Sequence, residues 1–235
     1  MSVVRFFGDS FCGPCEVTDT PGEIPDHWWG RKFANRLGKD IILHSKGGTS
    51  LEYTMLKLED YYKIIQQDDV VVICYTTPHR FYLNGKNIST TDLAAHIEGN
   101  SGAFKFIGND NHTPEVIDAA KRFILHLYDK EKQERLWLSH VLYIQQYLIP
   151  KIQSKGTKVI DFYSFPPPSY SMYCQLKELP VAETFIIENA GKNGVDPGPI
   201  LQTPNHFGNN NTEINLNKQW AEYLLTFYQK TLDIS

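Results

Sequence analysis

The stretch VVRFFGDS, residues 3–10, decides the fold that we expect for this chain. Its first part is mainly apolar, which predicts a short buried strand over Val3–Phe7. Gly8, Asp9 and Ser10 follow at once, and such a turn-forming tripeptide predicts that the strand ends there. We therefore expect Ser10 in the turn that leaves the carboxyl end of the first strand.

Downstream of this turn, apolar runs typical of strands alternate with patterns typical of helices. Val70–Tyr75 is apolar without interruption, as in a central strand covered on both faces. Strands that alternate with helices favour a parallel sheet. We therefore expect an α/β fold, a three-layer α/β/α sandwich of flavodoxin-like character with about five parallel strands. The further expected strands are 40–44, 158–165 and 185–188, and the expected helices are 27–37, 50–65, 114–129, 133–153 and 216–228.

The length of 235 residues suits one well-buried core and is short for two ordinary domains. We expect a single domain over residues 1–235. Residues 81–114 interrupt the alternation with many Asn, Gly, Ser and Thr residues, which predicts an insertion on the rim of the sheet.

The charge and hydropathy patterns exclude two classes of partner from our expectation. The chain has 23 Lys and Arg against 27 Asp and Glu, a net charge of -4, and no long basic run that would indicate nucleic-acid binding. The apolar runs are too short to span a bilayer, and the first residues do not resemble a signal peptide. We expect a cytoplasmic protein without a nucleic-acid or membrane partner, and the oligomeric state stays open.

The turn at Ser10 also carries a chemical hypothesis. Gly-Asp-Ser is often only a turn, but here a buried strand precedes it and a Gly-rich loop follows. The sequence Phe6–Phe11 resembles the first block of the GDSL-type esterases and lipases, the SGNH hydrolase family. That resemblance implies the fold of this family, Ser10 as nucleophile, and no cofactor or metal. A serine hydroxyl needs a base to take its proton, so a histidine must follow elsewhere.

The segment His44–Ser50 resembles the second block of the family, a strand that ends in glycine ahead of a helix. In that block the backbone N–H of a glycine points at the developing oxyanion, and no Cβ blocks the approach. Gly48 is the expected residue, with Gly47 next. The alternative is an ordinary strand-to-helix turn in which Thr49 or Ser50 caps the helix.

The third block departs from the family pattern, which usually carries Gly-x-Asn-Asp after the third strand. Thr77 stands here at the position of the Asn, and its hydroxyl can donate a hydrogen bond to the oxyanion. Arg80, close by, could bind an anionic part of a substrate. A literal Gly-Asn-Asp occurs at residues 108–110, but it lies inside the expected insertion, so we favour Thr77.

The last block is represented by Asn205-His206-Phe207, in the loop before the closing helix. The resemblance implies that His206 is the general base. The family usually places an aspartate three residues earlier, where this chain has Thr203. A Ser–His dyad can still work, or the orienting group comes from Asp196, Glu188 or a backbone carbonyl. The other histidines, which lack this position in the chain order, are His27, His44, His79, His96, His112, His126 and His140.

Cys12-Gly-Pro-Cys15 matches the active-site motif of thioredoxins, which lowers a thiol pKa at a helix N-terminus. The prolines and glycine that follow, at 21, 22 and 25, cannot continue a helix, so we expect no such helix here. The cysteines lack a partner pair at the spacing of a zinc site.

The resemblance implies an esterase. We expect a short-acyl ester as its substrate, and an acetyl group on a carbohydrate is one form of such an ester. The aromatic residues Phe81, Tyr82, Tyr170 and Tyr173 suit stacking on sugars, and they suit a lipid equally well. Two alternatives stay open: a non-catalytic binding or structural protein on the same scaffold, and a thioredoxin-like protein that uses Cys12 and Cys15.

Overall fold

Four parallel strands form the central sheet of the computed structural model. They are β1 (Val3–Phe7), β2 (Asp40–Leu43), β3 (Val70–Tyr75) and β6 (Lys158–Tyr163), in the order β2-β1-β3-β6. All three pairings are parallel, which confirms the α/β class expected from the alternation of elements. The structure describes residues 2–13, 24–83, 86–89, 114–168, 176–192, 197 and 211–232.

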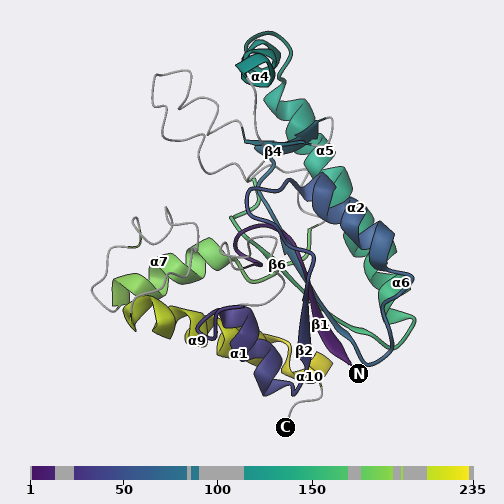
Figure 1. Ribbon diagram of the computed structural model, residues 1–235, viewed down its shortest axis with the longest axis vertical. Coiled ribbons are helices and arrows are strands. Elements are labelled where there is room, and N and C mark those ends of the chain that lie inside the picture. The colour runs from purple at the N-terminus through teal and green to yellow at the C-terminus, as the bar shows by residue number, and fades with distance from the viewer. Residues whose placement is uncertain are drawn as a thin grey trace.

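Helices cover both faces of this sheet (Figure 1), so the three-layer arrangement is also confirmed. Along each strand the side chains alternate between the layers: Phe6 packs into one core and Phe7 into the other. The first layer contains α1 (Trp29–Arg36), α7 (Ala182–Lys192), α9 (Asn211–Phe227) and α10 (Gln229–Leu232). The second contains α2 (Leu51–Tyr61), α5 (Lys130–Tyr143) and α6 (Ile149–Gln153).

The expected strand at 185–188 is wrong, because these residues lie within α7. A short apolar run cannot be assigned by periodicity alone. Ile186 and Ala190, four residues apart, are both buried, which is the spacing of a helix face. A single parallel bridge between Tyr163 and Val181 stands beside β6. The described sheet therefore has four strands where we expected about five.

The long helical pattern at 133–153 forms α5 and α6, joined by a π-helical turn, η2 (Ile144–Leu148). Pro150 has no N–H to donate along the helix, and the backbone N–H of Ile149 reaches back to the carbonyl of Ile144. The wider turn lets the chain remain helical through the proline.

The expected insertion begins with a hairpin of β4 (Arg80–Leu83) and β5 (Lys86–Ser89), an antiparallel pair separate from the main sheet. The hairpin packs on α2, where the rings of Tyr53 and Tyr82 lie 5.8 Å apart. Residues 90–113 lie outside the described part of the chain, and α4 (Pro114–His126) follows them.

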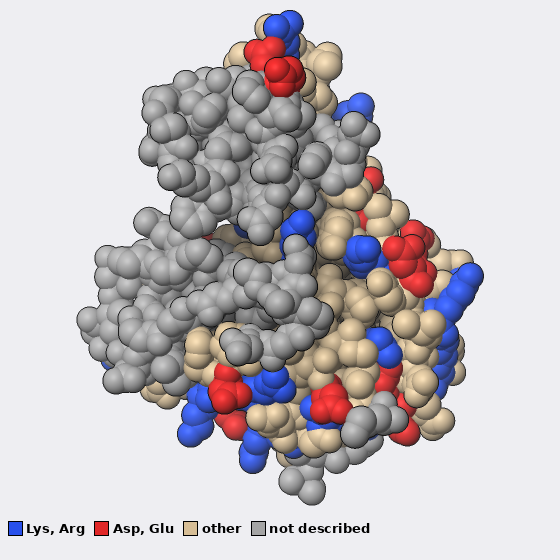
Figure 2. Space-filling view, in the orientation of Figure 1, with Lys and Arg blue, Asp and Glu red and all other residues tan. Residues whose placement is uncertain are grey.

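The described surface mixes charges of both signs. Figure 2 shows Lys and Arg side chains interspersed with Asp and Glu side chains over this face of the molecule. Within the described residues, no helix combines the length and apolar character needed to cross a membrane.

Candidate active site

The turn that carries Ser10 requires glycine at its first position. Gly8 has a φ of 151°, and a Cβ added there would lie 2.6 Å from the Cβ of Cys74 and 2.9 Å from that of Cys12. The chain therefore passes so close to β3 that a side chain cannot fit. Beyond Gly8 the turn closes through the backbone N–H groups of residues 12 and 13, which donate to the Asp9 carbonyl at 3.0 Å each. Ser10 lies in this turn and is 7% exposed.

The buried carboxylate of Asp9 holds the turn to the neighbouring strand ends. It accepts hydrogen bonds from the hydroxyl of Thr76 at 2.6 Å and from that of Ser164 at 3.0 and 3.1 Å. The backbone N–H of Phe11 donates at 3.0 Å, and Nη1 of Arg80 lies 2.8 Å away in an ion pair. Thr76 follows β3 and Ser164 follows β6, so one carboxylate joins the carboxyl ends of three strands.

Asp9, Thr76 and Ser164 are site residues that we did not predict from the sequence. A signal for them exists: Thr76 and Ser164 directly follow buried apolar strands, and polar residues in that position converge at one edge of a parallel sheet. Arg80, expected to face an anionic part of a substrate, instead directs Nη1 to Asp9 and Thr76.

Gly48 lies in a loop that is tied to the same turn. The backbone N–H of Lys46 donates to the Gly8 carbonyl at 3.0 Å, and the hydroxyl of Thr49 donates to the same oxygen at 3.1 Å. Gly48 has a φ of 74°, and an added Cβ would meet none of the described atoms within 4 Å. Its backbone is therefore left-handed, a conformation that favours glycine, and it is open on the side of the missing Cβ. Ser50 caps α2, so the loop also serves as an ordinary helix start.

Thr77 is half-buried in the loop after β3, at the carboxyl edge of the sheet. Its hydroxyl oxygen accepts a hydrogen bond from the backbone N–H of His79 at 3.3 Å, and the hydroxyl keeps its proton for donation. The preceding residue anchors the loop, because Nε1 of Trp137 donates to the carbonyl of Thr76 at 2.6 Å.

The expected base, His206, lies outside the described residues, so the pairing of Ser10 with His206 stays a prediction. Glu188 is described and lies on the exposed side of α7. Other residues of our expectation that fall outside the described part are Cys15, Gly108, Asn109, Asp110, Tyr170, Tyr173, Asp196 and Thr203.

His44 follows β2 at this edge, but its ring is enclosed by aromatic neighbours. The ring centroid lies 4.5 Å from that of Phe7 and 4.1 Å from that of Tyr61. Burial, with smaller contributions from the charges of Arg5 and Lys57, lowers the pKa of His44 to about 4. A base this weak and enclosed suits packing better than proton transfer from a serine.

His79 is the other described histidine that follows a strand at this edge. It is half-buried in the loop after β3, two residues from Thr77. Burial, followed by the charge of Lys130, lowers its pKa. His79 is therefore a second base to be tested against His206.

Cys12 does not have the surroundings of a reactive thiol. It is completely buried beside Gly8, and burial together with the nearby charge of Asp9 raises the pKa of its thiol well above the usual value. Thioredoxin-like chemistry requires a lowered thiol pKa, so this site favours a structural cysteine.

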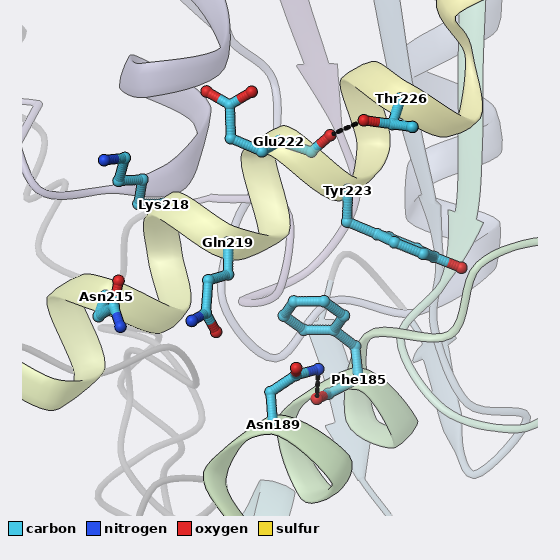
Figure 3. Close-up of a pocket in the computed structure, with 8 residues that line it drawn as sticks. All are labelled: Phe185, Asn189, Asn215, Lys218, Gln219, Glu222, Tyr223 and Thr226. Carbon is cyan, nitrogen blue, oxygen red and sulfur yellow. Dashed lines mark hydrogen bonds between the residues drawn. The ribbon is translucent and has the colours of Figure 1, made fainter. Parts of the chain in front are cut away.

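A separate cavity of about 520 Å³ lies between α7 and α9. Figure 3 shows Phe185 from α7 and Tyr223 from α9 beside it, among polar side chains of both helices. None of the residues that line it belongs to the Ser10 turn or to the strand ends described above.

The chain matches no protein-family model and no curated protein. Among solved structures it is similar to the X-ray structure of the protein YxiM from Bacillus subtilis, with 13% sequence identity and a TM-score of 0.33. The match covers 98% of this chain and 51% of that one, so this chain spans about half the length of YxiM.

Proposed function

We propose that this protein is a serine hydrolase that cleaves an ester, with Ser10 as nucleophile and His206 as general base. The observation that supports it best is the placement of Ser10. The residue follows the first strand of a parallel sheet, in a turn built around the buried carboxylate of Asp9. Open parallel sheets hold their catalytic groups at this carboxyl edge.

In the proposed reaction His206 takes the proton of the Ser10 hydroxyl while the oxygen attacks the ester carbonyl. The negative charge on the carbonyl oxygen is held by the N–H groups of Ser10 and Gly48 and by the hydroxyl of Thr77. His206 then gives the proton to the departing alcohol. Water, activated by His206, releases the acid from the acyl-enzyme.

The loop around Gly48 is suited to this role because it is fixed before any substrate arrives. Lys46 and Thr49 bind it to the carbonyl of Gly8, two residues before the nucleophile. Donors that are fixed in advance stabilise the oxyanion without rearranging during the reaction.

The substrate that we propose is a short-acyl ester, and an acetyl group on a carbohydrate is its more specific form. Tyr82 on β4 is half-buried and packs edge-on with Tyr53 at the rim of the fold. Aromatic side chains of this kind form stacking surfaces for sugar rings.

Fluorophosphonate labelling followed by peptide mapping tests the proposal. We expect the label on Ser10, and we expect Ser10→Ala to lose both the label and the hydrolysis of p-nitrophenyl acetate. Ser139→Ala is the matched control, because Ser139 is an exposed serine of α5 whose hydroxyl donates to the carbonyl of Leu136 in the same helix. An unlabelled native protein would contradict the proposal and favour a non-catalytic protein. A label retained in Ser10→Ala would contradict the assignment of Ser10 as the nucleophile.

The same assay separates the two candidate bases. His206→Ala should lower the labelling rate by about 1,000-fold or more, as for other catalytic bases of this type, and His79→Ala should leave it near the native value. The reverse result would assign the base to His79.

A further inference from the structure

The guanidinium of Arg80 lies between the rim hairpin and the nucleophile turn. Arg80 is the first residue of β4, and its side chain is 14% exposed. Nη1 lies 2.8 Å from Oδ2 of Asp9 and 3.1 Å from Oγ1 of Thr76. Asp9 immediately precedes Ser10, so the guanidinium is separated from the nucleophile by one carboxylate and one peptide unit.

Asp9 is fully buried, and a buried carboxylate requires both hydrogen bonds and a compensating charge. Thr76, Ser164 and the N–H of Phe11 are neutral donors. Among the described residues, Arg80 is the cation that forms an ion pair with Asp9. The charge balance of the turn therefore depends on a residue of the hairpin.

The hairpin has its own anchor on the fold, because Tyr82 packs on Tyr53 of α2. Because Arg80 belongs to β4, a movement of this strand relative to α2 would move the guanidinium away from Asp9. The N–H of Phe11 bonds to the carboxylate of Asp9, and the N–H groups of Cys12 and Gly13 bond to its backbone carbonyl. A shift of Asp9 would therefore loosen the residues that follow Ser10.

We propose that Arg80 is a positioning residue: through Asp9 it couples the β4–β5 hairpin to the Ser10 turn and keeps the nucleophile in its reactive position. The catalytic part of this inference rests on the proposed hydrolase function. The coupling itself does not, because it follows from the ion pair and the hydrogen bonds of the turn.

The experiment compares Arg80→Met and Arg80→Lys with Arg36→Met. Arg36 forms an exposed ion pair between α1 and α9, 3.3 Å from Glu222, and is therefore a matched arginine away from the site. Circular dichroism verifies that each variant is folded. With p-nitrophenyl acetate we expect Arg80→Met to lower kcat about 10- to 100-fold with KM nearly unchanged, as for a small misplacement of a reacting group.

Arg80→Lys keeps the charge but loses the planar geometry, so it should recover part of kcat. Arg36→Met should match the native enzyme. A folded Arg80→Met variant with native kcat, or an equal loss in Arg36→Met, would overturn the proposal. If Arg80→Met does not fold, Arg80→Lys is compared with Arg36→Lys instead. A kcat that is lowered only in Arg80→Lys supports the proposal, and an equal kcat in the two variants overturns it.

Hydrogen exchange provides the readout that does not need activity. Amides 11–13 should exchange at least about 10-fold faster in the Arg80 variants, whereas amides of β1 should keep their protection. Faster exchange without any hydrolysis in the native protein would leave the coupling intact and reject the hydrolase. Unchanged exchange at 11–13 would reject the coupling.

Discussion

The two edges of the sheet each contain a buried carboxylate paired with an arginine. At the amino edge, Asp69 is 1% exposed and accepts bonds from Nε of Arg5 at 2.9 Å, from the N–H of Val3 at 3.0 Å and from that of Gln66 at 3.1 Å. At the carboxyl edge, Asp9 pairs with Arg80 at 2.8 Å.

The partners of the two carboxylates distinguish them. Asp69 is bonded by backbone groups and by a residue of β1, so it fastens the start of β1 to the turn before β3. Asp9 is bonded by side chains that follow two other strands and lies next to Ser10. The same kind of ion pair, an arginine with a buried aspartate, therefore stabilises the fold at the amino edge. At the carboxyl edge, in our proposal, it positions the nucleophile.

Substitution of the glycine at each edge should give the largest effect on the free energy of unfolding. Gly8→Ala forces a Cβ against the Cβ atoms of Cys74 and Cys12, which cannot rotate away, and we expect a loss of about 2–5 kcal/mol in unfolding free energy. Gly156, at the amino edge before β6, has a φ of 81°, but its added Cβ would meet the exposed side chain of Gln67. Gly156→Ala should cost only about 1–2 kcal/mol.

Urea denaturation of both variants measures this difference. Equal losses in the two variants would show that the carboxyl edge is no more tightly packed than the amino edge.

Removal of the ion pair between Arg5 and Asp69 at the amino edge should give the next largest loss of unfolding free energy. Burial raises the pKa of Asp69, but the hydrogen bonds from Arg5, Gln66 and Val3 lower it by more, so the pKa lies below its usual value. A lowered carboxylate pKa stabilises the fold above the unfolded value of about 3.9, and this stabilisation is lost as the pH falls through the folded pKa. Asp69→Asn should therefore lose about 1–3 kcal/mol at pH 7 and progressively less below about pH 4.

Urea midpoints at pH 7, 5 and 3.5 provide the test, with fluorophosphonate labelling as the second readout. Labelling of Asp69→Asn should stay near the native rate. A loss of unfolding free energy that does not change with pH would show that the charge of Asp69 does not contribute to stability. A loss of labelling would show that the ion pair at the amino edge also affects the nucleophile, so the two edges would not differ in role.

Much of the sheet could be predicted because its strands are apolar runs that end in polar turns. Val70–Tyr75 is buried throughout, and β1 ends at Phe7 as its sequence predicts. The prediction of the last strand failed for a physical reason, because Phe185-Ile-Ile is apolar in either conformation. The burial of Ile186 and Ala190, four residues apart, distinguishes the helix, and Phe185 packs on Trp220 with ring centroids 5.0 Å apart.

The candidate site could be predicted only where a residue follows a strand. Ser10, Gly48 and Thr77 lie at the carboxyl edge for that reason. Periodicity does not tell which side chain of a turn points inward. It therefore did not indicate that Thr76, beside Thr77, directs its hydroxyl to Asp9, or that Arg80 is used in an ion pair.

The effect that is smallest at neutral pH concerns His44, which shares the carboxyl edge with Ser10 but serves packing. Its pKa of about 4 lies below the unfolded value of about 6.5. The unfolded chain therefore binds a proton between these pH values that the folded protein does not bind. The stability is full above about pH 6.5 and falls as the pH approaches 4.

The variant His44→Phe keeps a ring between Phe7 and Tyr61 and removes the group that binds the proton. Its stability relative to the native protein should rise as the pH falls from 7 to 4.5, whereas Tyr61→Phe should follow the native pH dependence. Native labelling in His44→Phe would limit the reactive part of this edge to the Ser10 turn and its partners, and a lost label would place the imidazole of His44 in the reaction.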